Sequence, residues 1–147
     1  RLESIGSVDT IDIYDDYGHH PTEIKTTLFG IKKAFNRRLV CIFQPHRYSR
    51  TQELYDSFPQ AFSDADAIFL TDIYEPSPIN SPTITSQSFA DLVSEHHDNV
   101  TYVSNKDHII STLIPTLQNG DIVITMGAGD IHHISSDLKA SLEKKGV

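Results

Sequence analysis

Residues 10–23 read TIDIYDDYGHHPTE, and within them the sequence changes from strand-like to helical. Residues 11–15 show the apolar pattern of a β-strand, and residues 22–35 show the spacing of an amphipathic helix. Residues 15–20, where the two patterns meet, hold two carboxylates, a phenol, two imidazoles and a glycine. Open α/β sheets bind ligands at such turns, beyond the carboxyl ends of their strands. Residues 10–23 therefore predict an α/β fold with a binding site at one edge of its sheet.

The alternation of strand and helix continues through the rest of the sequence. Apolar runs predict further strands at residues 39–43, 67–73, 100–103 and 121–126. Helical patterns predict helices at residues 52–62, around 89–93, at 109–117 and at 131–145, with interruptions at Pro59 and Pro115. The buried face of the first helix is predicted to hold Ile24, Leu28, Ile31 and Phe35. This order predicts a three-layer α/β domain with a mostly parallel, Rossmann-like sheet and helices on both faces.

Size and composition restrict the class of protein. A chain of 147 residues can form one domain with its own core, and we interpret it as a single domain with a boundary linker over residues 1–8. Because Arg1 is not preceded by an initiator methionine, we interpret the chain as part of a longer protein. The net charge of −8 argues against nucleic acid or an anionic membrane as a partner. No apolar run is long enough to span a membrane, and Cys41 lies in an apolar run that is typical of a buried, reduced thiol.

A second polar cluster, QPHRYSRT, occupies residues 44–51 after the second predicted strand. Ser49 is followed three residues later by a glutamine, the spacing of a capping box, which predicts that a helix begins here. Arginines beside a helix N-terminus oppose the helix dipole, so stability alone does not explain them. Guanidinium and backbone N–H groups together bind carboxylates and phosphates. We therefore predict an anion site at His46, Arg47 and Arg50, and the alternative is that both arginines pair with nearby surface acids.

The motif GAGD at residues 127–130 follows the last predicted strand. It lacks the final glycine of a dinucleotide fingerprint, and Asp130 as a helix cap explains it more simply. The sequence contains no G-x-x-x-x-G-K-[ST] phosphate loop. With a single cysteine there is no zinc framework, and no metal site is predicted in the chain. The Pro/Ser-rich residues 75–83 are predicted to be a solvated connector that leaves from the same sheet edge, with a flap as the alternative.

Taken in order, the motifs DDYGHHPTE, FQPHRYSRT and GAGD resemble those of the C-terminal domain of Mur ligases, a family of bacterial peptidoglycan synthesis. The opening Arg1-Leu2-Glu3-x-x-Gly6 resembles the family's domain-boundary motif. His20 and the run HRYSR resemble the members that add L-alanine, whereas members that recycle a whole tripeptide typically lack that run. One departure follows Tyr74, where the family commonly has small residues and an acid, and here Glu75 leads into the Pro/Ser-rich loop.

The resemblance implies a domain organisation and a reaction. Residues 1–147 would be the C-terminal, amino-acid-binding domain of a three-domain ligase of the bacterial cytoplasm. ATP would phosphorylate the carboxylate of UDP-N-acetylmuramate, and the amine of L-alanine would attack the acyl phosphate to form an amide. The N-terminal and central domains would be missing from this chain. The central domain would supply the phosphate loop and the Mg²⁺ ligands, so this domain alone is expected to be inactive.

The resemblance also implies roles for single residues. Arg1 and Asp16 would contact ATP, the former near the phosphates and the latter near the ribose. The residues expected to line the side of L-alanine and the acyl phosphate are Tyr17, His19, His46, Arg47 and Arg50, and of these His19, Arg47 and Arg50 are the expected catalytic residues. The residues alone do not decide whether His19 or His46 accepts a proton from the amine.

Two other classes of function stay open at this point. A metal-dependent phosphoesterase would hold divalent cations with Asp15, Asp16, His19, His20 and His46. A non-catalytic module would bind ATP without further domains. Within the Mur ligases, the tripeptide-recycling member is the alternative to the alanine-adding one. The ligase hypothesis requires that the turns after the first two strands meet in space, with His19 close to the cluster that contains Arg47.

Overall fold

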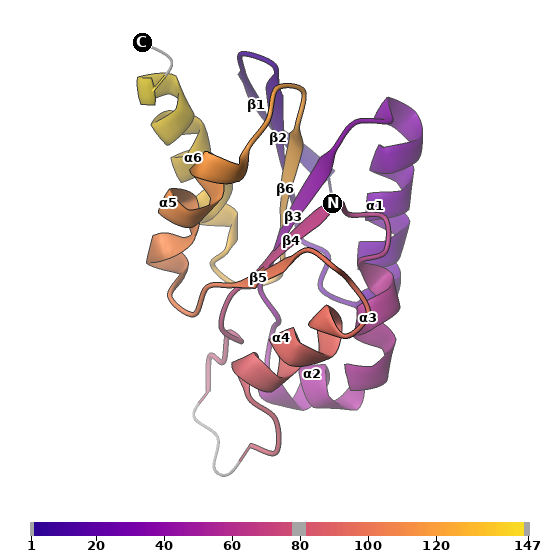
Figure 1. Ribbon diagram of the computed structural model, residues 1–147. Helices are drawn as coiled ribbons and strands as arrows, with labels where there is room; N and C mark the ends of the chain where they lie inside the picture. The colour runs from indigo at the N-terminus through magenta and orange to yellow at the C-terminus, as the bar shows by residue number, and fades with distance from the viewer. Residues whose placement is uncertain (1, 78–81, 146–147) are drawn as a thin grey trace.

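The computed structural model describes residues 2–77 and 82–145 of the chain. In these residues six strands form one sheet: β1 (Leu2–Val8), β2 (Ile11–Asp16), β3 (Leu39–Phe43), β4 (Ala67–Leu70), β5 (Val100–Tyr102) and β6 (Ile122–Met126). Their order across the sheet is β1-β2-β6-β3-β4-β5 (Figure 1). β1 runs antiparallel to β2, and all other neighbouring strands are parallel. The parallel strands therefore end at a common edge, which we call the carboxyl edge.

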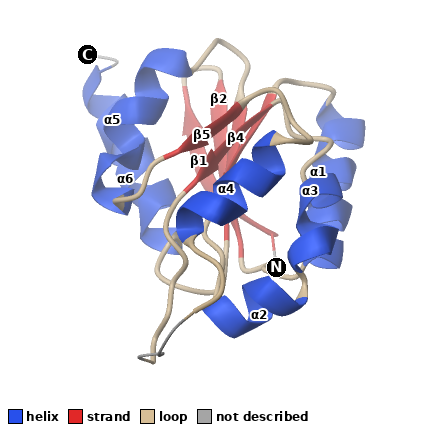
Figure 2. Cartoon of the chain, turned by 60° about the horizontal axis from the view of Figure 1, so that its bottom comes forward, coloured by secondary structure: helices blue, strands red, loops and turns tan. Residues whose placement is uncertain are grey.

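Helices cover both faces of the sheet (Figures 1 and 2). They are α1 (Pro21–Phe35), α2 (Tyr48–Glu53), α3 (Phe58–Ala61), α4 (Ser86–Ser94), α5 (Ile109–Leu113) and α6 (His132–Lys145), with short 3-10 segments η1 (Tyr55–Ser57), η2 (Lys106–His108) and η3 (Ile114–Thr116). One face packs against α1, α3 and α4, and the other packs against α5 and α6. The predicted three-layer α/β architecture with a mostly parallel sheet is confirmed.

β3 shows why its sequence is apolar without interruption. All of its residues are buried, and their side chains alternate between the two cores. Cys41 and Phe43 belong to the core beneath α1, whereas Ile42 belongs to the core beneath α6. A strand covered on both faces has no solvent side and therefore no polar alternation. Burial raises the pKa of the Cys41 thiol, which keeps it protonated, as the sequence predicted for a core cysteine.

The helix predicted at residues 22–35 is α1, which begins one residue earlier with Pro21. Ile24, Leu28 and Ile31 are buried as predicted. The prediction for Phe35 is wrong, because its side chain is 45% exposed. Phe35 is the last residue of the helix, and the chain then turns toward β3 through a left-handed Asn36.

The helix predicted at residues 52–62 is broken into three pieces and begins earlier, at Tyr48. The interruption precedes Pro59, which lies in the first turn of α3. Because proline cannot donate an N–H to the preceding turn, the chain ends one helix and starts the next with proline where no donor is needed. The capping box predicted at Ser49 is also wrong, since Ser49 lies inside the first turn of α2 rather than before it. The interruption predicted at Pro115 is confirmed by the change from α5 to η3.

Residues 2–8 were predicted to be a boundary linker, and this prediction is corrected, because they form the edge strand β1. The strand pairs with β2 from Leu2↔Asp16 to Val8↔Ile11, with an irregularity between Ser4 and Gly6. The strand predicted at residues 67–73 is shorter, because β4 ends at Leu70. The segment that follows bridges Tyr74 to His46 at the carboxyl edge.

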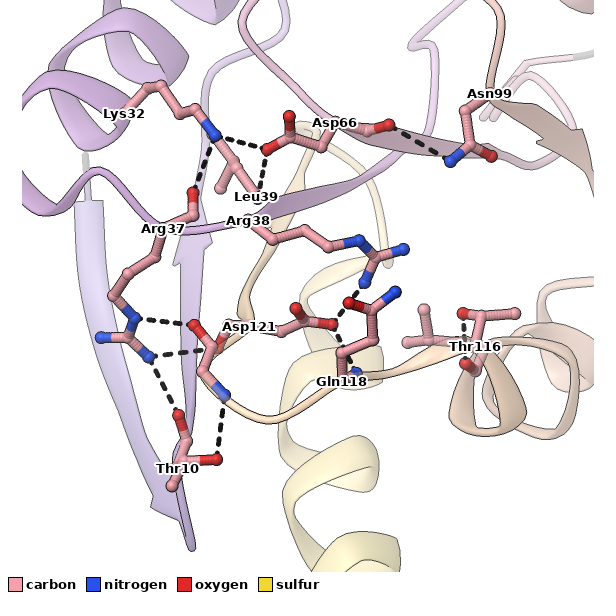
Figure 3. A network of polar contacts seen from close by, with 12 residues as sticks. Thr10, Lys32, Arg37, Arg38, Leu39, Asp66, Asn99, Thr116, Gln118 and Asp121 are labelled. Carbon is pink, nitrogen blue, oxygen red and sulfur yellow. Dashed lines mark hydrogen bonds and ion pairs between the residues drawn. The ribbon is translucent and has the colours of Figure 1, made fainter.

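A polar network holds the opposite edge of the sheet (Figure 3). Nη1 of Arg38 lies 2.5 Å from Oδ2 of Asp121, whose side chain is 1% exposed. Arg37 pairs with Asp12 at 2.6 Å and donates from Nε to the carbonyl of Gly120 at 2.7 Å. The network joins the amino ends of β2, β3 and β6, so it lies at the edge of the sheet opposite the carboxyl edge. Among the described helices, none has the length and apolar content to cross a membrane.

Candidate functional site

Asp16 organises the turn that follows β2. Its Oδ1 accepts a hydrogen bond from the N–H of Gly18 at 2.7 Å, and its Oδ2 accepts one from the hydroxyl of Thr27 at 3.4 Å. A Cβ atom at Gly18 would lie 2.9 Å from Oδ1 of Asp16 and 3.2 Å from Cε of Met126, so a glycine fits this turn best. The buried carboxylate that the sequence assigned to ATP therefore also shapes the turn itself, and its contact with ATP stays a prediction.

The first turn of α1 fixes the two histidines. His20 is the N-cap, and its Nδ1 accepts a hydrogen bond from the N–H of Thr22 at 3.1 Å. Oε1 of Glu23 accepts from the N–H groups of His20 at 3.0 Å and His19 at 3.1 Å. These two bonds, that of His20 first, lower the pKa of Glu23, so the carboxylate is charged at neutral pH. Nδ1 of His19 lies 3.2 Å from the carbonyl oxygen of Tyr17, which orients the imidazole.

The second cluster is attached to the segment after β4. The rings of His46 and Tyr74 stack with their centroids 5.6 Å apart. The N–H of Arg47 donates to the carbonyl of Tyr74 at 2.7 Å, and the N–H of Tyr74 donates to the carbonyl of Pro45 at 2.8 Å. His46 and Arg47 therefore lie at the carboxyl edge, after β3 and immediately before α2, and they contact the segment that follows β4.

The two clusters meet at this edge. The ring centroids of His19 and His46 are 5.9 Å apart, and the ring of Tyr17 contacts that of His19 edge-on at 5.8 Å. A pocket of about 300 Å³ lies where the turns converge, and it is lined by His20, Arg47, Ser49, Arg50, Glu53 and Leu54. The prediction that the turns after the first two strands meet is therefore confirmed, while the roles of the individual residues stay predictions.

Charge in the pocket is mixed. Nη1 of Arg47 lies 3.9 Å from Oε2 of Glu75, so this arginine pairs with an acid, although its side chain is still 44% exposed. For Arg50, no acidic side chain lies within ion-pair distance in the part of the chain that the structure describes. Burial, and then repulsion by His19, Arg47 and Arg50, lowers the pKa of His46, which leaves its imidazole neutral at neutral pH.

Four residues that line the pocket were not predicted as part of the anion site: His20, Ser49, Glu53 and Leu54. His20 was expected as a mark of the alanine-adding members or as a metal ligand of the alternative phosphoesterase, and Ser49 as a helix cap, yet both line the pocket together with the arginines. Glu53 and Leu54 follow Arg50 by about one helical turn, and this spacing is the signal that would have placed them there. Glu53 adds an acid to a pocket that the sequence described only as an anion receptor.

A second and larger pocket, of about 640 Å³, lies between the end of β2 and α1. Asp16, Tyr17 and Gly18 line it, together with Leu2 of β1. The Tyr17 side chain is 62% exposed. Tyr17, which was predicted to face L-alanine, therefore lines the larger pocket and not the smaller one, and its ring contacts that of His19.

The GAGD turn adjoins the same edge from β6. The Nε2 group of Gln44 donates to Oδ1 of Asp130 at 2.9 Å, and Nζ of Lys106 lies 3.4 Å from Oδ2. The carboxylate of Asp130 is thus bound by Gln44 and Lys106, and the helix cap predicted for it is not found. A Cβ at Gly129 would lie 2.6 Å from Oε1 of Gln44, which accounts for the glycine without a nucleotide.

The structure does not support the metal-dependent phosphoesterase. Asp15 and Asp16 are consecutive in a strand and point to opposite faces, since Asp15 accepts from the Thr125 hydroxyl and Asp16 from Thr27. Burial raises the pKa of Asp15, which disfavours the charged carboxylate that would have to bind a metal ion. Within residues 2–77 and 82–145, no three His, Cys, Asp or Glu side chains gather closely enough to hold a metal ion. Arg1 and residues 78–81 of the predicted connector lie outside the described residues.

Comparison with known proteins agrees with this geometry. The family model described as Mur ligase, glutamate ligase domain matches residues 1–129. This chain belongs to the Mur ligase family. Its fold matches a UDP-N-acetylmuramate–alanine ligase from Thermotoga maritima with a TM-score of 0.75, at 23% identity over 93% of this chain and 28% of that one.

Two curated relatives of this Mur ligase chain carry the same name. It is 44% identical to a UDP-N-acetylmuramate–L-alanine ligase from Geotalea uraniireducens, over 97% of the chain and 31% of the relative. It is 43% identical to the protein of the same name from Myxococcus xanthus, over 94% of the chain and 29% of the relative. The chain thus spans about a third of the length of the relatives that it matches.

Proposed function

We propose that this chain is the C-terminal, amino-acid-binding domain of an ATP-dependent ligase that joins L-alanine to UDP-N-acetylmuramate through an acyl phosphate. The observation that carries the proposal is the contact of the two turns, because it sets the imidazoles of His19 and His46 beside the pocket of Arg47 and Arg50. The shared name of relatives more than 40% identical supports this choice of substrates.

The pocket suits an α-amino acid. Arg50 is exposed, and its guanidinium can form two parallel hydrogen bonds with a carboxylate. Arg47 lines the same pocket, so either arginine can hold the carboxylate while the other neutralises the negative charge that develops on the acyl phosphate. The pocket of about 300 Å³ has room for a small amino acid, and the acid Glu53 offers a partner for its ammonium group before the proton is lost.

Two imidazoles can take part in proton transfer. His46 is neutral at neutral pH, because its lowered pKa keeps the ring unprotonated and able to accept a proton. In neutral His19, Nδ1 donates to the carbonyl of Tyr17, and this tautomer leaves the lone pair on Nε2. The larger share of the rate comes from orientation, since an amine held in line with an acyl phosphate loses much of its entropic barrier.

Other parts of the site belong to the longer protein. ATP supplies the phosphoryl group, and we expect Asp16 to approach it from the larger pocket and Arg1 to approach its phosphates. We expect the Mg²⁺ ligands to lie on the central domain of the longer protein, as the family resemblance implies. The ligase would act in the bacterial cytoplasm, with L-alanine, ATP and UDP-N-acetylmuramate as its small-molecule partners.

The proposal is tested with the full-length protein that contains this chain. Release of phosphate from ATP should require both L-alanine and UDP-N-acetylmuramate, and mass spectrometry should find the amide product. A parallel reaction with a tripeptide in place of L-alanine tests the recycling alternative. Turnover with the tripeptide and none with L-alanine would reject the proposed substrate.

A further inference from the structure

Glu75 connects the segment after β4 to the anion pocket. Its side chain is 14% exposed, although it is an acid in a surface loop. Oε1 accepts a hydrogen bond from the N–H of Tyr48 at 2.9 Å, and Oε2 lies 3.9 Å from Nη1 of Arg47. One carboxylate therefore holds the guanidinium of Arg47 and also the backbone that immediately follows it.

The backbone of Arg47 needs such support. Its φ of 68° and ψ of 134° lie in a region that residues with a side chain rarely occupy. Such conformations persist only where the surroundings fix them, and they gather at functional sites. Here the N–H of Arg47 donates to the carbonyl of Tyr74 at 2.7 Å, and its carbonyl accepts from the Thr51 hydroxyl at 2.8 Å. Glu75 provides the remaining support through the N–H of Tyr48.

Glu75 also explains how α2 begins between two arginines. The side chain of Arg47, the N-cap residue, makes no capping hydrogen bond. The carboxylate of Glu75 accepts the N–H of the first helical residue instead, and its negative charge favours the positive end of the helix. Without it, the N–H of Tyr48 would lose this acceptor and Arg47 would lose its paired acid.

We propose that Glu75 is a positioning residue, which fixes the backbone and guanidinium of Arg47 so that the arginine faces the amino-acid pocket. The inference rests on the proposed function, because it assigns the pocket to the carboxylate of L-alanine. Glu75 itself does not touch the reacting atoms. Its removal should loosen binding of the amino acid and leave the nucleotide sites unchanged.

Steady-state kinetics of the full-length ligase tests this role. Glu75→Ala should raise the KM for L-alanine by about tenfold, the size expected when a hydrogen bond to a charged group is lost. The KM values for ATP and UDP-N-acetylmuramate should stay within about twofold. Glu75→Gln keeps an acceptor for the Tyr48 N–H but loses the charge, so it should fold normally and show a smaller increase. Glu95→Gln, which removes an acid from the end of α4, is the matched control and should change none of these constants.

A double-mutant cycle separates positioning from simple stabilisation. Arg47→Gly removes the guanidinium and accepts the positive φ, so adding Glu75→Ala to it should not lower kcat/KM for L-alanine further. An equal loss in both backgrounds, or an unchanged KM in Glu75→Ala, would overturn the inference. Failure of the wild-type ligase to use L-alanine would instead reject the proposed function, so the two failures can be told apart.

Discussion

The two arginines of the pocket differ in their surroundings although they lie on the same helical turn. Arg47 pairs with Glu75 and has a strained backbone, whereas Arg50 is exposed, with no acidic partner among residues 2–77 and 82–145. Sequence reasoning predicted both as anion ligands, because cations at a helix N-terminus oppose its dipole. It did not predict the role of Glu75, since its hydrogen bond with Tyr48 joins residues 27 positions apart and depends on the pairing of strands.

At this scale we predict the effect of Arg47→Ala in the full-length ligase. The KM for L-alanine should rise by about tenfold or more, because a charged hydrogen-bonding partner of the carboxylate is lost. The KM for ATP should change little, since Arg47 lines the smaller pocket and Asp16 lines the larger. Lys33→Ala, which removes an exposed cation from the far end of α1, serves as the control. An unchanged KM for L-alanine would remove Arg47 from the pocket.

The elements differ in how far their own sequence determines them. α1 and β3 were predicted almost to the residue, because an apolar stripe and a continuous apolar run are local signals. β1 was missed, because its sequence contains a glycine and an irregular pairing, and only β2 beside it makes it a strand. The start of α2 was misplaced for the same reason, because its cap comes from Glu75 rather than from Ser49.

The first turn of α1 makes stability depend on pH through Glu23. Its pKa is lowered from 4.5 by the N–H groups of His20 and His19, so its contribution is present above pH 4.5 and is lost as the pH falls through the lowered value. Glu23→Gln should therefore reduce the free energy of unfolding at neutral pH by at most about 1 kcal/mol, because the side chain is exposed. Urea unfolding of both proteins at a series of pH values measures this, and the difference should shrink below pH 4.5. A difference that stays constant to lower pH would contradict the assignment.

At the scale of the whole molecule, the sheet separates stability from function. Its amino edge carries ion pairs such as Arg38 with Asp121, and its carboxyl edge carries the histidines and arginines of the site. The sequence predicted that separation in part, because polar motifs followed the strands. The partners at the amino edge come from distant positions, and no local pattern indicated them.

Arg38→Ala tests this separation of stability from function. It leaves the buried carboxylate of Asp121 without its cation, which costs about 3 kcal/mol of unfolding free energy. The pair of Lys32 and Asp66 is more exposed, so Lys32→Ala should cost no more than about 1 kcal/mol. Chemical denaturation compares the two variants, and the KM for L-alanine should be unchanged in folded Arg38→Ala protein. Equal losses of stability would contradict the role given to Asp121.

The central claim is that the turns after β2 and β3 form one pocket for one small amino acid. The most direct measurement is a crystal structure of the full-length ligase with L-alanine bound. We predict that the carboxylate of L-alanine lies within hydrogen-bonding distance of the Arg47 or Arg50 guanidinium, with its nitrogen toward His19 or His46. L-Alanine bound away from these four residues would contradict the claim.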